Sequence, residues 1–116
     1  MSCPPLTDFY VGDKVKVIVN WTNQGTSAVT VDIAFFIYHG ETGKLVNFGY
    51  LKAVTGYVGT NEHQIESEYA FATADVSTTP HHLVVVIGTN FNPQDMTFSD
   101  ELARLDCPNV VKVNAA

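Results

Sequence analysis

Apolar and polar side chains alternate along residues 15–21, and this alternation limits the folds open to the chain more than any other feature. Every second position there is apolar: Val15, Val17, Val19 and Trp21. Because successive side chains of a β-strand point to opposite faces, the pattern predicts a strand with one buried face. Asn23 and Gly25 follow, and both tolerate left-handed backbone, so we expect a hairpin loop there.

The same alternation predicts further strands. Residues 29–37 carry apolar side chains at every odd position, while the opposite face begins polar and becomes apolar at Ala34, Phe36 and Tyr38. That opposite face is expected to be partly covered or to present an aromatic patch. Residues 83–87 are apolar on both faces, which is typical of a strand in the centre of its sheet.

Other segments are less regular. One strand-like segment is interrupted at Gly49, which indicates a bulge or a bend. Residues 63–73 alternate again, which places Tyr69 on the inward face. Near the end of the chain, residues 102–105 fit either a helical turn or a strand, whereas residues 110–113 indicate a strand.

These segments add up to about seven strands separated by turn signals, with no convincing helix. The chain has 116 residues, of which 46% are hydrophobic, so we expect one domain, residues 1–116, with a core of its own. The predicted fold is all-β, an immunoglobulin-like antiparallel two-sheet sandwich of about seven strands. A barrel is the alternative architecture.

The charge of the chain disfavours two classes of partner. It has 12 acidic and six basic residues, for a net charge of −6, and the basic residues are spread thinly. Nucleic-acid binding and contact with an anionic membrane both need clustered Lys and Arg, so we expect neither. No apolar segment is long enough for membrane insertion, and residues 1–10 lack the features of a signal peptide.

The surface is expected to be polar but weakly charged, because only 16% of the residues are charged. Thr, Ser, Asn, Gln and Gly must cover the rest of it. This composition is common in β-rich proteins that work outside cells or on particles. We therefore expect an extracellular, cell-surface or virion-surface location.

The two cysteines, Cys3 and Cys107, lie near opposite ends of the chain, and each is followed by proline. A disulfide between them would close a loop of about 100 residues, which the chain-entropy model values at roughly 4 to 5 kcal/mol. It requires the two Cα atoms to lie within about 7 Å. Two reduced thiols, the default in a cytosolic protein, are the alternative.

Several stretches resemble the cell-adhesion-related (CARDB-type) domains of bacteria and archaea. The first is VGDKVKVIVNWTNQGTSAVTVDIAFFIY, where Gly12, Asp13, Asn23 and Gly25 match the family's Gly-Asp, alternating strand, Asn-x-Gly and second strand. Two later stretches, YVGTNEHQIESEYAF and VVVIGTNFNPQDMTFSDE, are similar to its later turn-and-strand and closing segments. The resemblance implies an immunoglobulin or fibronectin-III-like binding and spacer module, not an enzyme.

Metal binding has weak support in the sequence. The chain has four histidines, of which two are adjacent: His39, His63, His81 and His82. None has the Cys/His spacing of a zinc site, so we expect solvated turn histidines and no metal. Three acidic residues lie in or near one polar loop: Asp95, Asp100 and Glu101. They could supply only a few of the six or more oxygen ligands that calcium needs.

Catalysis has equally weak support. Glu66 and Glu68 share one face of an expected strand, but nothing near them in the sequence would raise one pKa or form a pocket. No nucleophile motif is present, so we predict no catalytic residue and no cofactor. Asn20 begins an Asn-Trp-Thr glycosylation pattern on the outward register, which a chance match also explains.

Three aromatic residues are the candidate binding surface: Phe36, Tyr38 and Tyr57. If they face outward, they form a patch suited to protein contact or carbohydrate stacking. The alternative is that they fill the core or cover its rim. Phe36 and Tyr38 stand out, because their register opposes the clearest apolar face of their strand.

The expected function is a non-catalytic immunoglobulin-like structural or binding module in an extracellular or surface assembly. Its partner would be another protein or copies of itself. A viral capsid-decoration or virion-surface protein is one alternative. A carbohydrate-binding module that uses outward aromatic residues is another. A self-assembling subunit would bury apolar surface against its copies, whereas a carbohydrate module would show coplanar aromatic rings along a shallow groove.

Overall fold

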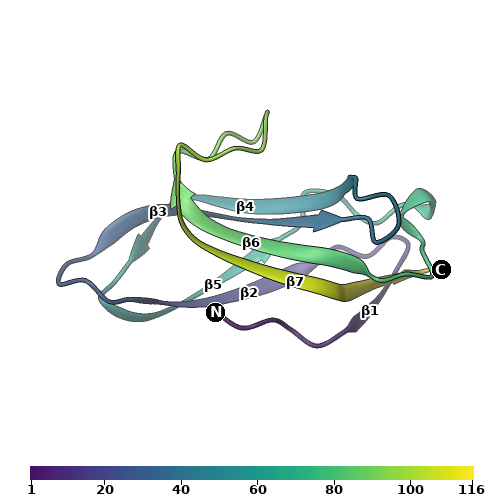
Figure 1. Cartoon of the computed structure of the whole chain (residues 1–116), viewed down its shortest axis with the longest axis horizontal. Helices are drawn as coiled ribbons and strands as arrows, with labels where there is room; N and C mark the ends of the chain where they lie inside the picture. The colour runs from purple at the N-terminus through teal and green to yellow at the C-terminus, as the bar shows by residue number, and fades with distance from the viewer.

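The computed structural model describes all 116 residues, and nearly all of its regular structure is β (Figure 1). The molecule is elongated, with extents of 47 × 28 × 20 Å. Its strands are β1 (Thr7–Tyr10), β2 (Lys16–Asn23), β3 (Val29–Tyr38), β4 (Leu45–Gly56), β5 (Gly59–Glu66), β6 (His81–Thr89) and β7 (Asp100–Asn114). A single 3₁₀ turn, η1, covers Thr73–Asp75. No helix is long and apolar enough to span a membrane.

The strands form two sheets. The larger has the order β1-β7-β6-β3-β4, and the smaller pairs β2 with β5. Strands β1 and β7 are parallel, whereas every other pair is antiparallel. The prediction of a wholly antiparallel arrangement was therefore wrong. The number of strands and the all-β class are confirmed.

The connection after β2 differs from the expected hairpin. Strand β2 pairs with β5, while β3 belongs to the other sheet, so residues 24–28 cross between the sheets. Asn23 shapes this crossing: its Oδ1 accepts from the Gly25 amide at 2.9 Å, and its Nδ2 donates to the carbonyls of Ser27 and Gly56. The Asn-x-Gly pattern thus identifies a turn, but not which strands it joins.

The core lies between the two sheets and follows the predicted alternation. Its buried members come from β2, β3, β5, β6 and β7 and the segments that flank them, among them Val15, Val19, Val31, Ile33, Phe35, Ile37, Ile65, Leu83, Val85 and Ile87. Trp21 is half-buried and packs against this cluster, whereas Val29 is exposed. The prediction that residues 83–87 form a central strand is confirmed, because β6 lies between β7 and β3.

A second apolar cluster covers the outer face of the larger sheet. Its buried members are Ala34, Phe36, Phe48, Val84, Val86 and Phe91. Met96 and Phe98 also pack against it, so the loop of residues 90–99 between β6 and β7 supplies part of the cover. Figure 1 shows this loop rising away from the strands at the end of β6.

Strand β4 is irregular, as expected, but not at Gly49. Its bulges lie at Lys52–Ala53, opposite Asp32, and near Val46. Gly49 instead marks a close approach: a Cβ there would lie 2.5 Å from the Glu66 carbonyl oxygen and would also meet the Phe35 ring. The expectation of a bulge at the glycine was wrong, and a lack of space explains the residue.

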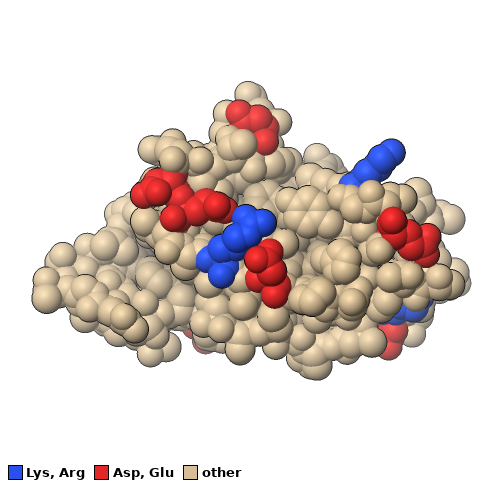
Figure 2. Space-filling view, viewed as in Figure 1, with Lys and Arg blue, Asp and Glu red and all other residues tan.

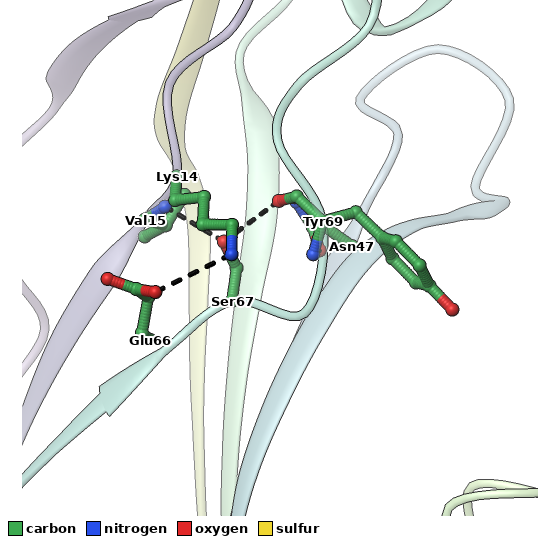
Figure 3. Close-up of polar contacts among 6 residues, drawn as sticks. All are labelled: Lys14, Val15, Asn47, Glu66, Ser67 and Tyr69. Carbon is green, nitrogen blue, oxygen red and sulfur yellow. Dashed lines mark hydrogen bonds and ion pairs between the residues drawn. The ribbon is translucent and has the colours of Figure 1, made fainter.

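Tyr69 is not an inward-facing residue. Strand β5 ends at Glu66, so the alternation stops before Tyr69, whose side chain is 61% exposed. The Tyr69 carbonyl accepts from the Ser67 hydroxyl and from Asn47 Nδ2, while Ser67 Oγ also accepts from the Val15 amide (Figure 3). These bonds turn the chain after the end of β5 and leave the Tyr69 ring pointing away from the core.

The C-terminal segment is one long strand. Residues 102–105, for which a helical turn remained open, lie in β7 together with residues 110–113. The register of β7 against β6 shifts between Cys107 and Val111. Pro108 lies at this shift, which is where a sheet tolerates a residue without an amide hydrogen.

Candidate binding surfaces

The structure does not bring together the three aromatic residues predicted to form a surface. Phe36 is only 4% exposed and belongs to the cluster beneath the loop of residues 90–99, so of the two outcomes left open for it the structure shows the buried one. Tyr38 is half-buried at the end of β3. Tyr57 is 66% exposed in the turn between β4 and β5. The outer face of the sheet is therefore largely covered by the chain's own loop.

A small pocket of about 280 Å³ remains at the edge of this cover. Phe36 and Tyr38 line it together with Met96, Phe98 and the polar residues Thr97, Glu101 and Arg104. Arg104 is already engaged, since its guanidinium lies 3.0 Å from Glu101 Oε1 and 3.4 Å from Asp106 Oδ1. A carbohydrate module would need coplanar aromatic rings on this face. The planes of the Phe48 and Tyr50 rings differ by only 6°, but Phe48 is buried.

A larger groove, of about 680 Å³, lies between the two sheets. One wall consists of residues 14–20, which include most of β2, and the other of β1, β7 and residues 1–5. Leu83 and Val85, two buried residues of β6, also line it, so the groove reaches the core. Twelve of its 19 lining residues are hydrophobic, which gives it the apolar character of most ligand sites.

The β2 wall of the groove is an unpaired strand edge. Strand β2 pairs with β5 along all eight of its residues and adjoins no other strand. The Ser67 amide donates to the Val15 carbonyl at 2.8 Å, which makes these two residues a hydrogen-bonded pair at the start of the ladder. Because such pairs alternate in an antiparallel ladder, even-numbered residues direct their backbone groups away from β5. These residues are Lys16, Ile18, Asn20 and Thr22.

The groove differs from the rest of the molecule in charge. It is lined by Lys14 and Lys16 and by no aspartate or glutamate, although the chain has twice as many acidic as basic residues. Lys14 Nζ lies 3.6 Å from Glu66 Oε1 at the end of the smaller sheet (Figure 3), whereas Lys16 has no ion-pair partner. Figure 2 shows a face that is mostly uncharged, with scattered acidic and basic groups.

The two cysteines form a disulfide, which answers the question left open by the sequence. The Cα atoms of Cys3 and Cys107 lie 5.5 Å apart, within the range that a bridge requires. Cys107 is buried in β7, so the bridge attaches the N-terminal segment to the larger sheet. Residues 1–5 are thereby held along the wall of the groove.

One of the predicted turn histidines is a core residue. His81 has no exposed surface: its Nδ1 accepts from the Gly40 amide at 2.9 Å, and its Nε2 lies 2.6 Å from the Asp75 carbonyl oxygen. Burial lowers the pKa of His81, as does the charge of His39, whose ring centroid is 4.6 Å away, although the Asp75 carbonyl opposes the shift. The expectation that His81 is solvated was therefore wrong.

His63 is also engaged, because its Nδ1 accepts from Trp21 Nε1 at 3.2 Å. The structure contains no group of three His, Cys, Asp or Glu side chains placed to hold a metal ion. Glu66 pairs with Lys14, and Glu68 lies beyond the end of β5, so the two carboxylates do not share a strand. Asp95 accepts hydrogen bonds from Asn92 and Thr97 within its own loop.

Two features of importance were missed in the sequence. Asp32 is a buried carboxylate that accepts from Lys52 Nζ and from the Ala53 and Phe91 amides, at 2.6 to 2.8 Å. A charged residue among the apolar side chains of β3 was the available signal for it. The groove had no local signal, because it depends on which edge of β2 remains without a partner.

Comparison with known proteins gives no assignment. No family model, no curated protein and no solved structure matches the chain. The resemblance to cell-adhesion-related domains therefore stays a prediction, and a functional assignment has to start from the geometry described above.

Proposed function

We propose that this chain is a non-catalytic immunoglobulin-like module of an extracellular or surface assembly, and that it binds a segment of another protein in the groove beside β2. The strand order supports the immunoglobulin-like part. Strands β7, β6 and β3 correspond to the GFC sheet of such domains, and β4 to the strand that variable-type domains add. The pair β2 and β5 corresponds to strands B and E.

The disulfide supports the location. Bridges such as Cys3–Cys107 persist in oxidising environments and are rare in the cytosol, where thiols are kept reduced. The low content of charged residues, 16%, agrees with a surface that works outside cells. A bridged chain is therefore best suited to a secreted or surface-displayed protein.

The groove is the observation that carries the proposed function. Its volume of about 680 Å³ lies within the range of about 300–1,000 Å³ typical of ligand sites. Two apolar residues of its lining, Met1 and Ile18, are 41% and 58% exposed, and a ligand that covered them would gain from the hydrophobic effect. The groove has no carboxylate or histidine to act as a general base, so binding fits its chemistry better than catalysis.

A peptide-display selection against the bridged chain tests this function. Thr7→Trp would place a large ring at the exposed Thr7 position in the groove wall and so should abolish capture of most selected peptides. Thr60→Trp on β5 is the matched control, because Thr60 is also exposed but does not line the groove. Peptides that bind the Thr7→Trp variant as well as the wild type would contradict the proposed function.

A further inference from the structure

We propose that the ligand of the groove is an extended, acidic and apolar peptide segment that adds to the free edge of β2 as an extra strand. This inference rests on the proposed function and deepens it, because it names the chemistry and the conformation of the bound segment. Three independent observations lead to it: the unpaired backbone of β2, the apolar lining of the groove, and the sign of its charge.

The unpaired backbone makes β2 a template for another strand. The amides and carbonyls of Ile18 and Asn20 face the groove, and no protein group bonds to them. An extended segment can pair with this edge through main-chain hydrogen bonds, as in β-strand addition. The chain's own N-terminal segment cannot make a regular ladder there, because Pro4 and Pro5 have no amide hydrogen.

The apolar lining selects the side chains of the added strand. Alternate residues of a strand face opposite sides, so every second residue would point toward Val17, Val19 and Val85 in the groove. The intervening residues would face outward beside Ile18, which is 58% exposed. A segment with apolar residues at alternate positions therefore fits, and a uniformly polar segment does not.

The charge of the groove selects an acidic segment and argues against a second copy of this chain. Lys14 and Lys16 lie at the start of the free edge, and although Lys14 pairs with Glu66, no aspartate or glutamate lines the groove itself. A second copy that paired through its own β2 would bring two more lysines to the same edge. A partner with aspartate or glutamate beside its apolar residues would instead gain from Lys16, which has no ion-pair partner.

The test uses a fluorescein-labelled synthetic peptide of eight residues, the length of β2, with alternating valine and threonine between two terminal glutamates. Binding to the bridged, non-glycosylated chain is measured by fluorescence anisotropy, since a glycan on Asn20 would occupy the groove wall. N-methylation of alternate backbone amides should weaken binding about tenfold or more when it blocks the edge that faces β2. Methylation of the opposite edge is the matched control.

Two variants of the protein complete the test. Ile18→Pro removes an amide that faces the groove without removing a bond to β5, so it should weaken binding about tenfold. Ile18→Ala, which loses the side chain but keeps the amide, should bind nearly as well as the wild type. Lys16→Glu should weaken the glutamate peptide about two- to fivefold and favour the same peptide with terminal lysines.

Binding that survives both N-methylation and Ile18→Pro would overturn the inference. If Thr7→Trp still abolished that binding, the groove would be a binding site without strand addition, and the proposed function would stand. Equal affinity for the glutamate and lysine peptides would overturn the acidic preference. Should Ile18→Pro fail to fold, the N-methylated peptides with wild-type protein decide the question alone.

Discussion

The protonation of His81 is tied to folding through its burial and its two hydrogen bonds. Its Nδ1 accepts a hydrogen bond from Gly40, so in the neutral ring Nε2 carries the proton and donates to the Asp75 carbonyl. Protonation of Nδ1 would break the first of these bonds and would place a charge in a site with no exposed surface. The contact between the β3–β4 turn and the start of β6 therefore requires the neutral form of His81.

Stability is predicted to fall on mild acidification. Since burial lowers the pKa of His81 in the folded chain, the unfolded chain binds a proton first as the pH falls through its ordinary value of 6.5. The stabilisation is complete above that pH, and its loss amounts to at most about 1.4 kcal/mol per pH unit for one proton. Urea denaturation at several pH values measures it.

The variant His81→Gln should flatten this dependence, because glutamine can both donate and accept but does not titrate. Thr60→Gln, at an exposed position in the smaller sheet, introduces no titrating group; it is the control and should leave the slope in place. An equal slope in the wild type and in His81→Gln would contradict the assignment to His81.

At the scale of elements, Asp32 connects three parts of the larger sheet. Its carboxylate accepts from Lys52 and Ala53 in the bulge of β4 and from Phe91 at the start of the loop of residues 90–99. Ala53 has a φ of 53°, a left-handed conformation that costs energy for a non-glycine residue and that the bond from its amide supports. Burial raises the pKa of Asp32, but the hydrogen bonds from Ala53, Lys52 and Phe91 outweigh it and lower the pKa.

Removing this carboxylate should loosen the loop and the bulge together. Asp32→Ala is expected to lower the free energy of unfolding by about 3 kcal/mol, because it leaves the Ala53 and Phe91 amides without their acceptor and Lys52 with only the Phe91 carbonyl. Hydrogen exchange should speed up at the Ala53 and Phe91 amides above all. Asp32→Asn, which keeps one acceptor oxygen, should lose less, and unchanged protection at both amides would contradict the proposed link.

At the scale of the whole molecule, the Cys3–Cys107 bridge ties the start of the chain to its last strand. The two residues are 104 positions apart, so the bridge closes nearly the entire chain into a loop. A bridge of this span restricts the unfolded chain far more than the folded one. It also fixes residues 1–5 along the groove, and so links overall stability to the shape of the binding surface.

Reduction of the bridge should lower the free energy of unfolding by roughly 2 to 5 kcal/mol. Urea denaturation with and without dithiothreitol measures the change, and Cys3→Ser should reproduce it without reductant. A reduced chain with the same denaturation midpoint as the bridged chain would contradict the prediction. Lys44→Ser, which is remote from the bridge, controls for substitution at an exposed site.

Local patterns in the sequence predicted local outcomes well. The alternation around Ile33 and Phe35 placed their side chains in the core, and the continuous apolar run of β6 placed that strand in the centre of its sheet. The pattern failed at Tyr69, because hydrogen bonds from Ser67 and Asn47 turn the chain after β5. At Phe36 it left a covered face and an exposed aromatic patch both open, because the cover comes from a loop more than 50 residues later in the sequence.

The sequence by itself therefore determined the all-β class, the number of strands and the inward face of most of them, since side-chain direction in a strand depends only on position. Pairing does not. That β2 pairs with β5 and not with β3, that β1 runs parallel to β7, and that one edge of β2 stays open were decided only by the tertiary structure. Backbone hydrogen bonds look alike for every residue, so the choice of partner depends on how all the strands pack around one core.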